Sequence, residues 1–185
     1  MRKIVAGLFV SLDGVTESPE GWTFPYFDDE VGQAIGAQMA SSDAMLLGRR
    51  TYEEFARYWP EADAPFAGYM NETPKYVAST SLTSVEWRGS TLLRGDVAGA
   101  VAALKREPGK DISIPGSVTL VRTLLGVGLV DQLRLLLYPI VVGRGKRLFE
   151  GPSDQVPMKL LDSRTFGTGV VSLTYEPPAV GKGVS

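Results

Sequence analysis

The residues best suited to hold a charged ligand lie in the segment Leu-Leu-Gly-Arg-Arg-Thr-Tyr-Glu, where an apolar run stops at Gly48 and an amphipathic helix begins. Glycine allows close backbone approach, and the first-turn N–H groups of a helix are unpaired and point outward. Arg49 adds a charged fork and Thr51 a hydroxyl. This combination is typical of phosphate binding. The structural alternative pairs Arg49 with Glu53 or Glu54 on its own helix.

Two other strand ends carry small polar residues of the same kind. Gly116 and Ser117 precede a predicted helix that we expect Ser117 to cap, and the positive end of this helix either faces a pyrophosphate or belongs to a plain capped helix. Ser79 and Thr80 follow a predicted strand, and their hydroxyls either bind an adenosine ribose or its phosphate or stabilise a turn. Three such ends predict a nucleotide ligand.

The standard nucleotide fingerprints are missing from this sequence. No G-x-G-x-x-G follows the first predicted strand, and residues 143–147 lack the spacing and the Ser/Thr of a P-loop. A standard Rossmann dehydrogenase and a P-loop NTPase are therefore disfavoured.

Three aspartates are candidates to hold or relay a proton. Asp28 shares a helical face with Val31 and Ile35, so we expect it to point toward the sheet, as a helix cap or as a pocket acid. Asp29 turns elsewhere, and Asp13 lies in the turn after the first strand. The loop that follows, residues 15–25, carries aromatic side chains that either cover a pocket or belong to the core.

Composition removes several classes of chemistry. The chain has no histidine and no cysteine, which excludes imidazole and thiol catalysis and metal sites built on either ligand, so no metal is expected. A net charge of −2 disfavours nucleic acid, and no apolar run reaches membrane-spanning length. Without a leader peptide, we expect a cytoplasmic protein. Its length predicts a single domain at 1–178, with a disordered tail at 179–185.

The predicted elements alternate between strands and helices until the final third of the chain. Strands are predicted at 3–10, 44–47, 75–79, about 91–93 and 111–114, and helices at 28–40, 51–58, 97–105 and 117–125. Strands at 132–142, 158–164 and 170–175 then follow with only loops between them, including a hairpin turn at 167–169. This order predicts an α/β fold of three layers, α/β/α, with a mixed, mostly parallel sheet and antiparallel C-terminal strands.

Residues 11–14, 43–53 and 116–143 together resemble, in order, the dihydrofolate reductase fold, and more closely the C-terminal reductase domain of the riboflavin-biosynthesis protein RibD. The resemblance covers nearly the whole chain. It implies an NADPH-dependent reductase that acts on a pterin-like, pyrimidine-like or other small conjugated substrate, including 5-amino-6-(5-phosphoribosylamino)uracil reductase-like activity. It also implies a homodimer. The exposed edge of the mixed sheet would suit that assembly.

The resemblance also assigns cofactor contacts. The residues implied are Gly48, Arg49 and Thr51 for the phosphates, Ser79 and Thr80 for the adenosine end, Gly116, Ser117 and Val118 for the pyrophosphate, and Ala6, Leu12 and Gly14 for the nicotinamide.

The substrate side departs from both relatives. Ile114 stands where RibD-like domains often place a glutamate, and Pro115 stands where dihydrofolate reductases have the first of two glycines. Asp28 or Asp29 matches the single pocket acid of dihydrofolate reductases. A second hypothesis is a non-catalytic NADP(H)-binding or ligand-sensing module on the same fold.

Overall fold

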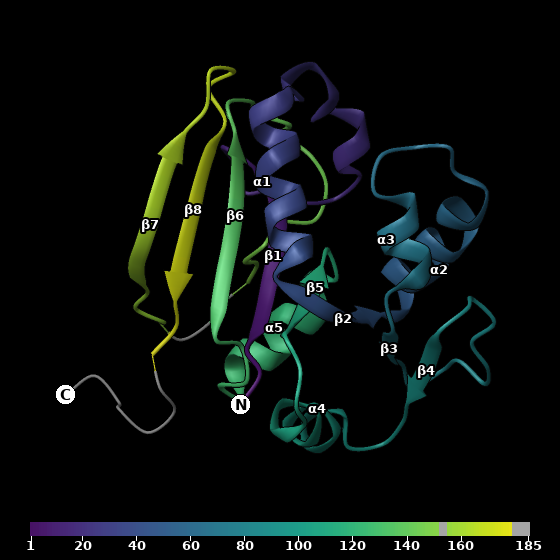
Figure 1. Ribbon diagram of the computed structural model, residues 1–185. Coiled ribbons are helices and arrows are strands. Elements are labelled where there is room, and N and C mark those ends of the chain that lie inside the picture. The colour runs from purple at the N-terminus through teal and green to yellow at the C-terminus, as the bar shows by residue number, and fades with distance from the viewer. Residues whose placement is uncertain (152–154, 179–185) are drawn as a thin grey trace.

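The computed structural model describes residues 1–151 and 155–178, and these build one eight-stranded sheet (Figure 1). The strands are β1 (Ile4–Ser11), β2 (Ser42–Gly48), β3 (Lys75–Ala78), β4 (Ser90–Leu93), β5 (Asp111–Pro115), β6 (Gln132–Tyr138), β7 (Lys159–Thr165) and β8 (Val171–Glu176). Their order across the sheet is β4-β3-β2-β5-β1-β6-β8-β7. The pairs from β4 to β6 are parallel and the pairs made by β8 are antiparallel, which confirms the predicted mixed sheet.

Five α-helices cover the two faces of this sheet. They are α1 (Asp29–Ala40), α2 (Arg49–Tyr58), α3 (Ala67–Glu72), α4 (Val97–Arg106) and α5 (Val118–Gly126), with short 3-10 turns η1 (Pro19–Gly21), η2 (Phe24–Tyr26) and η3 (Trp59–Glu61). One core cluster joins α4 and α5 to alternate residues of β1, such as Ile4 and Leu8. Two other clusters lie on the opposite face, under α1 and under α2 with α3. In Figure 1, α1 lies in front of the sheet and α5 behind it, so the three-layer prediction holds.

The main omission in the predicted elements is α3, since the sequence analysis assigned no element between the helix at 51–58 and the strand at 75–79. This helix has only six residues and follows Pro65 and Phe66, and the φ of Phe66 is +72°. A helix this short does not repeat an apolar period, and packing of Met70 in the core holds it instead. Strand β6 also ends at Tyr138, earlier than predicted, because Pro139 has no N–H to donate.

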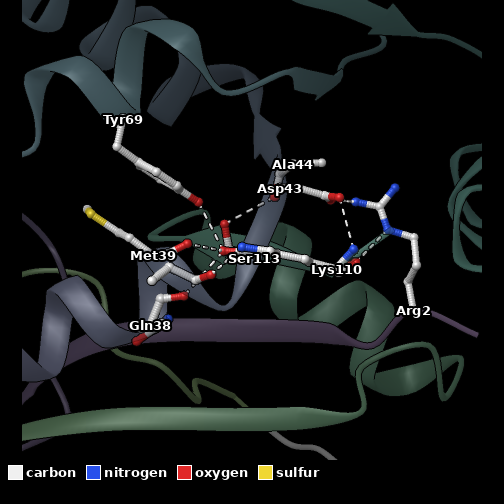
Figure 2. Close-up of polar contacts among 10 residues, drawn as sticks. Arg2, Gln38, Met39, Asp43, Ala44, Tyr69, Lys110 and Ser113 are labelled. Carbon is white, nitrogen blue, oxygen red and sulfur yellow. Dashed lines mark hydrogen bonds and ion pairs between the residues drawn. The ribbon is translucent and has the colours of Figure 1, made fainter. Parts of the chain in front are cut away.

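A network of satisfied polar contacts closes the sheet edge where β2 and β5 begin (Figure 2). The Ser42 hydroxyl shares a 2.9 Å hydrogen bond with the Tyr69 hydroxyl. Asp43 forms an ion pair with Arg2 and accepts a 2.9 Å hydrogen bond from the Lys110 backbone N–H. Arg2 Nε in turn donates to the Lys110 carbonyl at 2.6 Å. These contacts tie the N-terminus to both strands, so this edge has a structural role.

Lys75 is the most deeply buried charged residue among the described residues. Lys75, at the start of β3, is fully buried, and its Nζ donates to the carbonyls of Asn71, Thr73 and Arg88 at 2.8–3.1 Å. The same Nζ lies 4.2 Å from the centre of the Trp87 ring. Burial lowers the pKa of Lys75 to about 8, and the charge of Arg88 adds to the shift. Lys75 therefore fixes the loop before β4 to the end of α3.

None of the described helices is long and apolar enough to cross a membrane. In the same part of the chain, no group of acidic residues could hold a metal ion. The predicted tail at 179–185 lies outside the described residues, so the domain boundary at 178 stays a prediction.

Candidate functional site

The β2–α2 and β5–α5 junctions interlock at the edge where these parallel strands end. The backbone N–H of Gly48 donates to the Ser117 Oγ at 2.9 Å, and the backbone N–H of Ser117 donates to the Thr51 Oγ1 at 3.1 Å. Gly116 makes this approach possible, because its φ is +66° and a Cβ at that position would lie 3.4 Å from the Thr51 side chain. The Gly116 N–H also donates to the carbonyl of Gly7 in β1 at 3.3 Å. Three strands are thus tied together at one point.

The helices at this point begin without side-chain caps. Asp28 caps α1 and Asp96 caps α4, each accepting a backbone N–H at 2.9 Å. The residues before α2 and α5, Gly48 and Ser117, make no such bond to their own helices. The sequence analysis expected Ser117 to cap α5, but its φ of +45° turns the hydroxyl toward Gly48 instead. The first-turn N–H groups of two neighbouring helices therefore lack side-chain acceptors, as in an anion site.

Arg49 forms the ion pair that the sequence analysis weighed as its structural alternative. Its Nη1 lies 3.0 and 3.2 Å from the two carboxylate oxygens of Glu53, one turn further along α2. Both side chains are about 40% exposed, at 41% and 39%. Exposed pairs at this spacing contribute only about 0.3–0.5 kcal/mol, so a phosphate could displace Glu53 at little cost. The phosphate role of Arg49 stays a prediction.

Ser79 and Thr80 lie after β3, two strands away from β5. The Ser79 Oγ is buried and accepts from the backbone N–H groups of Ser81 and Leu82 at 3.2 and 2.9 Å, which is the turn-stabilising alternative. Thr80 is exposed. The structure gives Ser79 a local role, and its contact with an adenosine end is untested.

The turn after β1 is held by Asp13. Its carboxylate accepts from the Ser11 hydroxyl at 2.7 Å and from the backbone N–H groups of Val142 and Gly143 at 3.0 and 2.8 Å. The Ser11 hydrogen bond is the largest cause that lowers the pKa of Asp13 to about 2, followed by the Val142 N–H. This carboxylate is therefore ionised at neutral pH and fixes the neighbouring Leu12, which is 59% exposed, and Gly14.

The remaining candidates are spread along β1 and α1. Asp28 is half-buried, and its Oδ1 accepts the Val31 N–H as a helix cap. Asp29 is exposed. Ala6 is fully buried in the core on the α4 and α5 side, so its side chain presents no surface to a ligand. No hydrogen bond or ion pair between the described residues links Asp28 or Asp13 to the Ser117–Thr51 interlock.

The loop aromatics divide between core and surface. Trp22 and Tyr26 pack edge-on against the ring of Tyr138, with centroids 5.5 and 6.0 Å away, and Trp22 is buried. Burial raises the pKa of Tyr138 to about 12, and its hydroxyl has no hydrogen-bond partner among the described residues. Phe24 is 83% exposed. The loop after β1 thus anchors itself in the core through Trp22.

Comparisons with known proteins agree with this arrangement. The family model described as RibD C-terminal domain matches residues 2–172. The uncharacterized protein YyaP of Bacillus subtilis (strain 168) is 30% identical over 182 residues, which cover 94% of each chain.

Two solved structures share the fold. A putative riboflavin biosynthesis protein from Shewanella superposes with a TM-score of 0.78 at 22% identity, over 95% of this chain and 99% of its own. Dihydrofolate reductase from Enterococcus faecalis, solved with NADP(H), gives a TM-score of 0.63 at 14% identity, over 95% and 96%. The fold is therefore that of dihydrofolate reductase, and the family is of reductase type. The chain belongs to the RibD C-terminal domain family.

Proposed function

We propose that this protein is an NADPH-dependent reductase that transfers hydride to a C=N or C=O bond of a small pterin-like, pyrimidine-like or other conjugated substrate. The observation that carries this proposal is the pair of uncapped helix N-termini, α2 and α5, joined by the Ser117 and Thr51 hydrogen bonds. In open α/β sheets, ligands bind beyond the carboxyl ends of the strands, where this pair lies.

The residues present fit a dinucleotide with a pyrophosphate. Gly48 and Gly116 have no side chain, so Ser117 and Thr51 pack against them and bring the first turns of α2 and α5 together. The N–H groups of the first turns of α2 and α5, including Val118, are available to donate to those oxygens. Arg49 would leave Glu53 to add a charged hydrogen bond. NADPH supplies the hydride when it is bound.

We assign to Asp28 the transfer of the proton that the reduction requires. Helix α1 begins at the edge where β1 ends, because α1 connects β1 to the parallel strand β2. One Asp28 oxygen accepts the Val31 N–H, and the other has no hydrogen-bond partner among the described residues. Asp13 is ionised and fully used by its turn, and Asp29 is exposed. Asp28 therefore relays the proton to the substrate, directly or through a water that it positions.

A non-catalytic NADP(H)-binding or ligand-sensing module is the second candidate. The observation that favours it is that Asp28 already caps α1 and Arg49 already pairs with Glu53, so both residues have structural roles that need no turnover. In either case we place the protein in the cytoplasm.

We also propose a homodimer formed through the outer strands of the sheet. Every residue of β7 is exposed, and Leu160 and Leu161 on this strand are 50% and 42% exposed. An edge strand with exposed apolar residues is a common surface for self-association. Sedimentation of the wild type and of Leu160→Lys would separate a dimer from a monomer.

The experiment that tests the cofactor site is a tryptophan-fluorescence titration with NADPH and, separately, with NADH. We compare the wild type with Thr51→Val, which keeps the side-chain shape but leaves the Ser117 N–H without its acceptor. Thr123→Val is the matched control, because Thr123 is exposed on α5 and bonds only within that helix.

We expect saturable binding with a preference for NADPH, weakened about tenfold by Thr51→Val and unchanged by Thr123→Val. Turnover on a panel of conjugated ring substrates would then separate the reductase from the binding module. If neither nucleotide binds to the wild type, both candidate functions are wrong.

A further inference from the structure

A hollow lies between α1 and the C-terminal strands, apart from the β2–α2 and β5–α5 junctions. It has a volume of about 390 Å³, within the usual range for small-molecule sites. Ala34, Ala37 and Gln38 of α1 form one wall. The rest of the lining comes from β1, β6, β8 and β7, and in Figure 1 β6, β8 and β7 follow one another outward from α1. None of the residues that line this groove belongs to the Ser117–Thr51 interlock.

Three polar residues that line the groove, Arg134, Thr174 and Asp162, lie in one row of paired residues that starts at Gly7 and crosses four strands. Gly7 of β1 pairs with Arg134 of β6, Arg134 with Thr174 of β8, and Thr174 with Asp162 of β7. Directly paired residues point to the same face of a sheet. Gly7 has no side chain, and the carboxamide of Gln38 occupies the space where a Cβ would stand. The Gln38 carboxamide is therefore brought down beside Arg134.

Arg134 is held in place by neutral acceptors only. Its Nε and Nη2 donate to the Gln132 Oε1 at 3.3 and 2.9 Å, and its Nη1 lies 3.5 Å from the Ser41 Oγ. Within residues 1–151 and 155–178, no carboxylate lies within ion-pair distance of Arg134. By contrast Arg164, on the same face, is paired with Glu30 at 2.7 Å. The positive charge of Arg134 is oriented but not compensated, as in a site for an acidic group.

Groups that can bind hydroxyls surround this charge. Ser172 and Thr174 line the groove from β8, and neither hydroxyl has a hydrogen-bond partner among the described residues; the same is true of the Gln38 carboxamide. Asp162 lies at the far end of the row, two strands or about 10 Å from Arg134 along the sheet. The negative charge of the Asp162 carboxylate disfavours a second acidic group on the ligand, and its oxygens can accept hydrogen bonds from ligand hydroxyls.

We propose that this groove is a binding site for a small hydroxylated organic anion, whose acidic group is held by Arg134 and whose hydroxyls contact Ser172, Thr174 and Asp162. The groove is separate from the proposed cofactor edge. Because α1 carries Gln38 in the groove and Asp28 at its N-terminus, occupation of the groove would also restrain the helix that positions Asp28.

The test is a residue-resolved NMR titration of the full chain with glycerol 3-phosphate, with inorganic phosphate and uncharged glycerol as comparison probes. Glycerol 3-phosphate should shift the Arg134 Nε–H, the Gln38 side-chain amide and the backbone N–H groups of Ser172 and Thr174. Inorganic phosphate should bind more weakly and glycerol not at all. Shifts confined to the first turns of α2 and α5 would overturn the groove proposal while supporting the cofactor edge. An absence of shifts in the groove would overturn it as well.

Two variants make the assignment specific. Arg134→Gln should weaken binding of glycerol 3-phosphate in the groove about tenfold or more, since hydrogen bonds to charged groups are among the strongest. Lys159→Gln is the matched control, because it removes one positive charge from the exposed strand β7 outside the groove. Thr174→Val removes an unpartnered hydroxyl, so it should not disturb folding. It should weaken the binding of glycerol 3-phosphate more than the binding of inorganic phosphate. Equal weakening of both affinities would contradict the role of the Thr174 hydroxyl.

Discussion

The Ser117 Oγ accepts a hydrogen bond from the backbone N–H of Gly48 at 2.9 Å, across 69 residues of sequence. A serine before a helix normally caps that helix, but here it serves the neighbouring one. The consequence is that α5 begins uncapped beside an uncapped α2. The free N–H groups at this edge therefore depend on the Ser117 hydroxyl, which bonds to Gly48 and not to its own helix α5.

Replacing Ser117 by alanine should therefore affect both stability and cofactor binding. The variant leaves the Gly48 N–H without its acceptor, and we expect a loss of about 1–3 kcal/mol in the free energy of unfolding. NADPH affinity should fall in the same variant, because the two helix ends lose their relative position. Urea unfolding and the fluorescence titration measure the two effects. Ser163→Ala, at an exposed position of β7, should change neither.

The Arg49–Glu53 pair gives a test in which two variants should act in opposite directions. Arg49→Ala should weaken NADPH binding about tenfold or more, because a charged hydrogen bond to phosphate is lost. Glu53→Gln frees Arg49, so NADPH binding should be unchanged or tighter, while the helix loses only about 0.3–0.5 kcal/mol. If Glu53→Gln weakens binding as strongly as Arg49→Ala, the pair acts as a structural unit and Arg49 does not contact the phosphate.

Asp28 can be separated into its capping and catalytic roles. Asparagine caps helices about as well as aspartate, so Asp28→Asn should leave the free energy of unfolding nearly unchanged. Its reductase turnover should fall by a factor of about 10² to 10⁴, since the amide holds no transferable proton. Asp28→Ala should in addition lose about 1 kcal/mol of stability. Full turnover in Asp28→Asn would show that the proton comes from elsewhere.

Lys75 should make stability depend on pH in the alkaline range. Its pKa is about 8 in the folded protein and 10.5 in the unfolded chain, so the unfolded state binds more protons between these values. The free energy of unfolding should therefore rise as the pH increases from 8 to 10.5, with only a small contribution to the slope near pH 7. Urea unfolding of the wild type and of Lys75→Met at both ends of this range gives the difference. A rise of the same size in Lys75→Met would assign the effect to other groups.

Much of the fold could be predicted because it depends on local patterns. Apolar runs that alternate with amphipathic segments located the strands from β1 to β6 and four of the five described α-helices. The hairpin between β7 and β8 was also predicted, and there the N–H groups of Phe166 and Gly169 close the turn. The helix α3 was missed because six residues carry too little periodic signal and tertiary packing decides their structure.

The candidate site was predictable in its parts but not in its connections. Sequence motifs named Gly48, Thr51, Gly116 and Ser117, yet the bonds between them depend on β2 and β5 being neighbours in the sheet. The sequence also showed that Arg49 had an acidic neighbour, and the structure shows the pairing with Glu53. Arg134 was not recognised at all, because its isolation from carboxylates is a property of tertiary structure.

The interlock between Gly48 and Ser117 also bears on how the protein folds. Segments 69 residues apart must close a long loop before either hydrogen bond exists, and such distant contacts form late in folding. A ligand that bridges α2 and α5 would bind only chains in which β2 and β5 have already paired. Binding at this edge would therefore slow the unfolding of the centre of the sheet. It would not accelerate the first steps of folding.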